Sequence, residues 1–260
     1  MTNLFDLPAA KASSTASSKE ALRNKAFPRQ ALRYVALARP NHYGKNILVL
    51  AGILLAIAHQ PVAITPQLLF TIICGLAATC LIASSNYVLN GILDADSDRF
   101  HPGKRDRPVA SGRVSLAVAY LEWLVLGGLG LSLAYCVGRS FFAIAAALAV
   151  MGLFYNVPPV RLKDMPYIDV LSEAINSPIR LMLGWALVIP TEIPDIRLIL
   201  AFWMAGAFAM AWKRLREFRF LRDRSVAAAY RRSFAHYDES RLKTCMAVYA
   251  LSAAAFLLAW

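Results

Sequence analysis

The chain of 260 residues is 58% hydrophobic and has a mean hydropathy of +0.49, which excludes an ordinary soluble domain and is typical of a polytopic helical membrane protein. Its formal net charge of +12 at pH 7 could suit nucleic acid, but in so apolar a chain it indicates anionic lipid and positively charged loops, so no nucleic-acid partner is expected. The four cysteines and four histidines lack disulfide or metal-ligand spacing, so neither a disulfide nor a His/Cys metal site is expected.

The N-terminal segment is polar and rich in Ser, Ala and Lys. Because it lacks the apolar core of a signal peptide, we predict a disordered cytoplasmic tail over residues 1–30. Residues 31–260 are expected to form one transmembrane domain. Pro40 suits the first turn of a helix that leads into the first apolar run.

Seven apolar runs predict an all-α membrane bundle of about seven spans, because a chain inside a bilayer must satisfy its backbone hydrogen bonds internally. Of the 28 Lys and Arg, Arg139 and Arg197 alone fall in the linkers at 59–66, 136–140 and 190–197. Nearly all the others fall in the tail and in the loops around 94–114, 156–167 and 213–243. The positive-inside rule therefore predicts that the N-terminus and these three basic loops are cytoplasmic. The expected spans are 40–59, 66–89, 115–136, 140–157, 168–189, 197–213 and 243–260.

Three oxygen-bearing side chains recur every four residues where the second run ends: Asn90, Asp94 and Asp98. On a helix this spacing puts them on one face, and their hard oxygen ligands suit Mg²⁺. An isolated motif of this kind is more often a frayed helix end, but this one lies at the edge of a bilayer-length apolar run. The hydrophilic loop that follows supplies cations suited to phosphate oxygens: Lys104, Arg105 and Arg107. The stretch predicts a magnesium–diphosphate site.

The loop before the fifth run contains Pro158 and Pro159, which forbid a helix there and stiffen the turn. Arg161 and Lys163 follow them. They are either ordinary positive-inside residues or, because they lie beside Asp169, ligands for phosphate.

The fifth run is unusually polar for a span. Asp169, Glu173, Asn176 and Arg180 follow one another at steps of four, three and four, which places them on one helical face. A charged side chain at the helix centre costs roughly 2.5–3.5 kcal/mol on insertion scales. Either Glu173 and Arg180 form an ion pair, or the stripe lines a wet cavity, and we favour the cavity. Pro178 is expected to bend this helix.

A basic amphipathic segment over residues 213–224 follows the sixth run, and Tyr230, Arg231 and Arg232 come soon after. An interfacial helix on anionic lipid explains this segment at least as well as a catalytic role does. Lys213 and Arg214 lie nearest to the span and are its best candidates for reaching the site.

Taken together, these motifs resemble the UbiA superfamily of intramembrane prenyltransferases from about Arg39 onward. The stretch from Asn90 through Asp94 to Asp98 resembles its first aspartate-rich motif. The pair Asp169 and Glu173, preceded by Tyr155 and Lys163, resembles its second. Gly91 stands where the family commonly has Asp, Glu173 stands where Asp is usual, and the family usually has nine spans.

The resemblance implies a Mg²⁺-dependent transfer of a prenyl group from an isoprenoid diphosphate to a lipophilic or aromatic acceptor, with release of pyrophosphate. Mg²⁺ would bridge the two acidic motifs and the diphosphate. The implied metal ligands are Asn90, Asp94, Asp98, Asp169 and Glu173. The implied catalytic set adds Lys163 and Tyr155 to the four carboxylates. The implied phosphate contacts are Lys45, Asn46, Lys104, Arg105, Arg107, Arg161, Arg180 and Lys213.

Two alternatives remain open. The segment from His101 to Pro108 and the pair Lys45 and Asn46 are similar to superfamily members that transfer phosphoribose from phosphoribosyl pyrophosphate to a polyprenyl phosphate. In the other alternative, the protein is a transporter in which Glu173 and Arg180 carry protons or an anion, or an inactive homologue weakened by Gly91.

Overall fold

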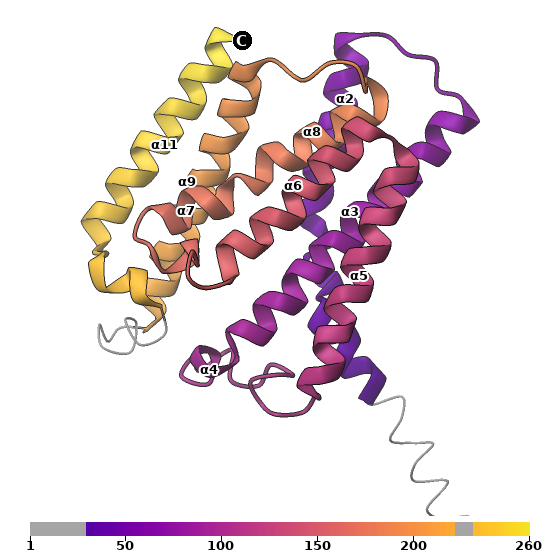
Figure 1. Cartoon of the computed structure of the whole chain (residues 1–260). Helices are drawn as coiled ribbons and strands as arrows, with labels where there is room; N and C mark the ends of the chain where they lie inside the picture. The colour runs from indigo at the N-terminus through magenta and orange to yellow at the C-terminus, as the bar shows by residue number, and fades with distance from the viewer. Residues whose placement is uncertain (1–29, 222–230) are drawn as a thin grey trace, which may run out of the picture.

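The computed structural model describes residues 30–221 and 231–260, and in these ranges every regular element is a helix. The all-α prediction is therefore confirmed, whereas the predicted tail over residues 1–30 lies, except for its last residue, outside the described residues. The chain runs through a helix over residues 30–38, then η1 (Pro40–Asn46), α2 (Ile47–His59), α3 (Pro66–Leu93), α4 (Ala95–Asp98), α5 (Leu116–Val137), α6 (Arg139–Asn156), η2 (Leu162–Asp164), α7 (Ile168–Ala174), α8 (Asn176–Val188), α9 (Ile196–Leu221), η3 (Arg232–His236) and α11 (Glu239–Ala259) (Figure 1).

Six stretches of helix among the described residues are long and apolar enough to cross a membrane. They correspond to six of the seven expected spans. The fifth expected span is wrong as a continuous helix, because the structure divides it at Ile175 into α7 and α8, each too short to cross alone. Pro178, near the start of α8, has no N–H to donate to the carbonyl of Ala174, which weakens the helix at this point.

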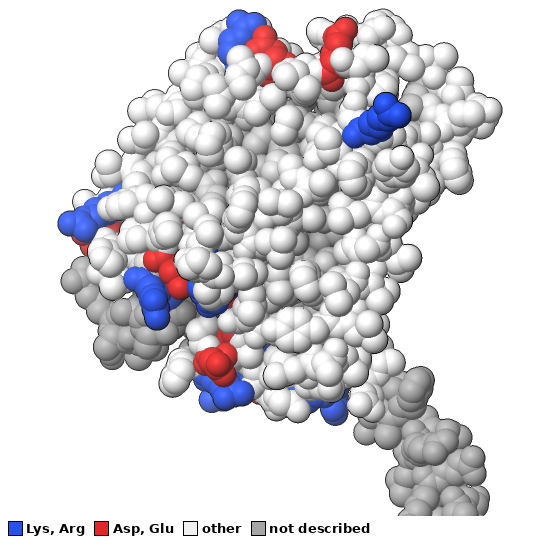
Figure 2. Space-filling view, viewed as in Figure 1, with Lys and Arg blue, Asp and Glu red and all other residues white. Residues whose placement is uncertain are grey.

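The charged side chains gather at the two ends of the bundle. Figure 2 shows Lys, Arg, Asp and Glu near the upper and lower ends of this face, with a broad uncharged band between them. Such a band is what an integral membrane protein presents to lipid. The α4 region, the 157–167 turn and η3 lie at one end, opposite the α2–α3 and α8–α9 linkers (Figure 1). The side of the membrane that each end faces stays a prediction.

Local sequence explains how the long helices begin and end. Pro66 starts α3, and the hydroxyl oxygen of Thr65 accepts a hydrogen bond from the backbone N–H of Leu68 at 3.2 Å, so the helix is capped at its first turn. Gly138 separates α5 from α6 with a φ of 156°, a backbone conformation that favours glycine. The chain therefore turns back within a single residue at the end opposite the acidic motif.

Helices α2 and α8 touch through their backbones. A Cβ atom built on Gly184 would lie 1.9 Å from the carbonyl oxygen of Val49, and one built on Gly52 would lie 2.0 Å from the carbonyl oxygen of Leu181. Close approach of this kind, made possible by small residues, is a common way of packing helices in membranes. It fixes α8 against α2, and thereby positions the start of α8 beside η1.

Gly184→Ala should lower the melting temperature of the detergent-solubilised protein markedly, because the new methyl group meets backbone that cannot rotate away. Overpacking costs about 1–3 kcal/mol in ordinary cores, and a backbone contact belongs at the upper end of that range. Gly128→Ala in α5 is the matched control, since a Cβ there meets nothing within 4 Å. Equal melting temperatures for the two variants would contradict this description of the α2–α8 contact.

Candidate active site

The first acidic motif lies at the junction of α3 and α4. The backbone N–H of Asp94 donates to the carbonyl of Asn90 at 3.0 Å, and that of Asp98 to the carbonyl of Asp94 at 2.8 Å, so the helical spacing continues through the motif. The side-chain amide nitrogen of Asn90 donates to Asp94 Oδ2 at 2.9 Å and to Asn156 Oδ1 at 2.7 Å. Asp98 is 1% exposed and pairs with Arg107 at 2.6 Å.

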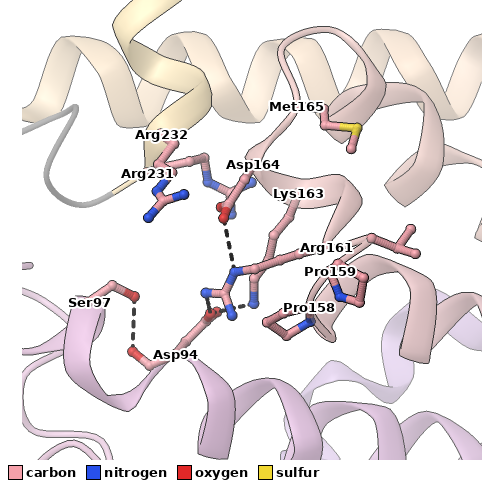
Figure 3. A pocket seen from close by; sticks show the side chains of 11 residues that line it. Asp94, Ser97, Pro158, Pro159, Arg161, Lys163, Asp164, Met165, Arg231 and Arg232 are labelled. Atoms are coloured by element: carbon pink, nitrogen blue, oxygen red, sulfur yellow. Dashed lines mark hydrogen bonds and ion pairs between the residues drawn. The ribbon is translucent and has the colours of Figure 1, made fainter.

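Two cations from the turn before α7 reach this motif. Lys163 is 3% exposed and donates to Asp94 Oδ1 and, at 2.9 Å, to Asn156 Oδ1. Arg161 approaches Asp94 Oδ1 at 3.3 Å and pairs with Asp164 at 3.0 Å. Figure 3 shows both side chains pointing at Asp94 from the turn that contains the two prolines. Arg161 itself has a φ of 29°, a strained conformation of the kind that clusters at functional sites.

Burial and charge act in opposite directions on these groups. Burial lowers the pKa of Lys163 to about 8, although the carboxylate of Asp94 favours the ammonium form. Burial also disfavours the charged form of Asp94, but Lys163 and Arg161 outweigh it and bring the pKa of Asp94 below its ordinary value. Burial raises the pKa of Asp98, against the opposing effect of Arg107. Asp94 is thus the firmly ionised member of the motif.

A pocket of about 650 Å³ opens beside Asp94. Its walls come from the α3–α4 junction, from the turn after α6 and from the start of η3, three segments that are far apart in the sequence (Figure 3). It contains four cationic side chains and two carboxylates, so an anion is the ligand that it favours. The lining residues are Asp94, Ser97, Pro158, Pro159, Val160, Arg161, Lys163, Asp164, Met165, Arg231 and Arg232.

The second acidic motif is held by α9 and η3. Asp169 is fully buried and accepts hydrogen bonds from Arg214 Nε at 2.7 Å and from the hydroxyl of Tyr237. Glu173 accepts from Lys213 at 2.9 Å and from Arg214 at 2.8 Å. The hydroxyl of Tyr155 also donates to Glu173, at 3.0 Å. Arg214 has no exposed surface and is the shared partner of both carboxylates.

The donor sets of the two motifs differ in how well they suit Mg²⁺. Asn90 turns its amide nitrogen to its neighbours, so its oxygen is available beside the ionised Asp94, and this set fits a hard cation. Both oxygens of Asp169 are already hydrogen-bonded to buried groups. Among the described residues no three His, Cys, Asp or Glu side chains lie together as a metal site. Cations of α9 hold the carboxylates of the second motif, and the expected Mg²⁺ bridge between the two motifs stays a prediction.

The remaining residues predicted from the sequence to contact phosphate lie in different surroundings. Lys104 lies near the same end and pairs with Glu217 at 3.0 Å, whereas Arg105 is exposed to solvent. Arg180 does not pair with Glu173, contrary to one of the two interpretations of the polar stripe. Its guanidinium donates instead to Asn46 Oδ1 at 3.0 Å and to the carbonyl of Asn176 at 3.1 Å. Lys45 is exposed on η1.

Packing explains the glycine that departs from the family pattern. A Cβ atom at Gly91 would lie 2.8 Å from Leu37 Cδ1 and 3.9 Å from Arg39 Nη2. The N-terminal helix thus packs directly against the motif at the position where the family carries Asp. A side chain at Gly91 would have to displace Leu37, which is 2% exposed.

Sequence reasoning missed several residues of the site. Asn156 joins Asn90 to Lys163, yet a single Asn at the end of an apolar run carries no signal. The sequence carries no signal for Tyr237 either. Arg231 and Arg232 were visible as part of a basic stretch, but nothing in the sequence indicated that they return to Asp94. Residues 222–224, the end of the expected amphipathic segment, and Tyr230 lie outside the described residues.

Comparison with known proteins gives a consistent result. The sequence profile described as "UbiA prenyltransferase family" matches residues 46–260. The decaprenyl-phosphate phosphoribosyltransferase of Mycobacterium tuberculosis (strain H37Rv) is 31% identical over 229 residues, which cover 87% of this chain and 72% of that protein. The nodulation protein NoeC of Azorhizobium caulinodans is 31% identical over 210 residues, which cover 80% of this chain and 65% of NoeC.

A similar fold occurs among solved structures. A UbiA homologue from Archaeoglobus fulgidus, bound to DMAPP and Mg²⁺, superimposes with a TM-score of 0.71 over 86% of this chain and 76% of that chain, at 19% sequence identity. At this identity the likeness shows the fold alone.

Proposed function

The chain belongs to the UbiA prenyltransferase family of intramembrane transferases, and from that premise we propose that it transfers a phosphoribosyl group from phosphoribosyl pyrophosphate to a polyprenyl phosphate. The observation that carries this proposal is the excess of cations in the pocket beside Asp94. A donor that bears a diphosphate and a further phosphate needs more positive charge than a prenyl diphosphate does. The similarity to a phosphoribosyltransferase over most of the chain supports the same choice.

We assign Mg²⁺ to Asn90, Asp94 and Asp98, whose oxygens suit it. When bound there, it would neutralise charge on the departing diphosphate. Asp169 and Glu173, as the structure has them, hold Arg214 and Lys213 in place. Under this proposal their role is to position α9 cations along the wall of the site.

The pocket residues bind and orient the donor. Lys163 and Arg161 are already directed at Asp94, so they would contact phosphate oxygens without a large rearrangement. Arg231 and Arg232 lie on the opposite wall (Figure 3). In the reaction an oxygen of the polyprenyl phosphate forms a bond to C1 of the ribose while the bond from C1 to the diphosphate oxygen breaks, and pyrophosphate leaves. Fixed cations at the leaving oxygens lower the barrier because they need no reorganisation.

The test uses purified protein in lipid with Mg²⁺. Phosphoribosyl pyrophosphate with polyprenyl phosphate is expected to give pyrophosphate release that EDTA abolishes. A prenyl diphosphate with mixed aromatic acceptors is the second arm. Release in the second arm alone would overturn the phosphoribosyl proposal. Release in neither arm would also overturn it, and would favour an inactive or differently specific homologue.

Prenyl transfer is the second candidate. The observation in its favour is the UbiA homologue of the same fold that was solved with DMAPP and Mg²⁺. Under either candidate the donor pocket lies at the end of the bundle that carries the basic loops, which we propose to be the cytoplasmic end.

A further inference from the structure

Arg180 is a buried cation for which the described part of the chain provides no carboxylate partner. It lies on α8, is 7% exposed, and donates to the neutral oxygens of Asn46 and Asn176. No carboxylate of residues 30–221 or 231–260 lies within ion-pair distance of it. In contrast, Lys163 and Arg214 each contact at least one carboxylate. A charge inside a membrane bundle normally pairs or marks the path of a charged ligand.

The charged groups near Arg180 carry more positive charge than negative charge. The phenol of Tyr87 on α3 interacts electrostatically with both Arg180 and Lys213. His42 on η1 interacts electrostatically with Lys45 and Lys213. Lys45 is exposed and, within the described ranges, has no carboxylate at ion-pair distance. These cations come from η1, α8 and α9, and each of them interacts electrostatically with Tyr87, His42 or Glu173.

Depth separates this region from the donor pocket. Arg180 follows the first residue of α8, Asn176, by four residues, which corresponds to about 6 Å of helix at 1.5 Å per residue. The donor pocket opens beside Asp94 at the charged end of the bundle. A water-soluble donor would reach Asp94 from that end, whereas a phosphate on an apolar chain would arrive from the bilayer and meet Arg180.

We propose that Arg180, assisted by Lys45, binds the phosphate group of the lipid-linked acceptor at a site separate from the donor diphosphate. The identity of that acceptor as a polyprenyl phosphate rests on the function proposed above. Asn46 acts as a positioning residue, because its amide oxygen accepts from Arg180 Nε and its amide nitrogen donates to Cys80 Sγ at 3.1 Å. Arg180 Nη1 donates to the carbonyl of Asn176, so Nη2 is the nitrogen that can face the phosphate.

Asn46→Asp tests this directly, since it adds a carboxylate beside Arg180 with almost no change in shape. The variant should bind undecaprenyl monophosphate at least roughly thirtyfold more weakly than the wild type, because the guanidinium is already neutralised. Its affinity for phosphoribosyl pyrophosphate should stay within about twofold of the wild-type value. Its melting temperature should be no lower than that of the wild type. Binding is measured in nanodiscs by native mass spectrometry. Asn41→Asp, on the exposed side of the same element, is the matched control and should bind as the wild type does.

Further arms identify the ligand. Undecaprenol, inorganic phosphate and phosphatidylglycerol are each offered to the wild type. Tight binding of the monophosphate, with weak binding of all three, supports a lipid-linked phosphate. Equal binding of undecaprenol, or equal competition by inorganic phosphate or phosphatidylglycerol, overturns that assignment. Lys45→Gln, an exposed position that folding does not need, should weaken monophosphate binding in the same direction.

The results also separate this site from the proposed reaction. If Asn46→Asp binds undecaprenyl monophosphate as the wild type does while phosphoribosyl transfer proceeds, the site is wrong and the function stands. If the monophosphate binds through Arg180 but phosphoribosyl pyrophosphate gives no product, the function is wrong and the site stands.

Discussion

Asp94→Asn is expected to lower the turnover rate by roughly a hundredfold to a thousandfold while leaving a folded membrane protein. Asp94 is the carboxylate on which Lys163 and Arg161 converge, and it borders the pocket of about 650 Å³. The amide can still accept a hydrogen bond from Lys163, so the fold should survive. It cannot neutralise the buried ammonium or hold a divalent cation, so donor binding and charge stabilisation should both fail. Steady-state pyrophosphate release measures the effect.

Asp96→Asn is the matched control for this change. Asp96 lies two residues away, its side chain is 95% exposed, and its ion pair with Arg99 is a 3.5 Å surface contact. Exposed pairs contribute about 0–1 kcal/mol, so turnover should be unchanged. Arg139→Ala, at the opposite end of the bundle, should be equally neutral. Comparable losses in Asp94→Asn and Asp96→Asn would show that the site has been misplaced.

Arg214→Gln is expected to destabilise the protein by about 3–5 kcal/mol, because it leaves buried carboxylates without their shared cation. Arg214 has no exposed surface and contacts both Asp169 and Glu173. For a chain of this size the loss corresponds to a fall in melting temperature of roughly 6–20 °C, measured by thermal unfolding in detergent.

Arg216→Gln provides the comparison, since Arg216 is an exposed cation on the same helix. Its melting temperature should match that of the wild type. Removing both charges with Asp169→Asn and Arg214→Gln should cost less than the sum of the two single changes, because residues in contact are coupled. Additive losses would contradict the ion pair at the centre of this network.

The helical architecture could be predicted because hydrophobic run length and cation placement act locally. The motif from Asn90 to Asp98 was equally visible, since four-residue spacing on a helix fixes a face. The division of the fifth span at Ile175 was anticipated as a bend through Pro178 but not as two helices. Whether a proline bends a helix or ends it depends on packing against other helices, which spacing along the chain does not give.

The partners of the charged residues could not be predicted. Arg214 and Asp169 are 45 residues apart, and Lys163 and Asp94 are 69 residues apart. Spacing along the chain gave Glu173 and Arg180 as a plausible pair, but Arg180 bonds to Asn46, 134 residues away. Periodicity predicts which residues share a face and carries no information on which face of another helix they meet. The assignment of metal ligands from sequence therefore stays a prediction for both motifs.

The backbone contact between α2 and α8 has a consequence for biosynthesis. Gly52 and Leu181 meet although roughly 130 residues separate them, so α2 enters the membrane long before its partner is made. At about 5–20 residues per second, the interval is roughly 6–26 s. During that time the face of α2 that contains Gly52 is in contact with lipid or with the insertion machinery. We expect the nascent chain to be most vulnerable to membrane proteases in this window, and the arrival of α8 to end it.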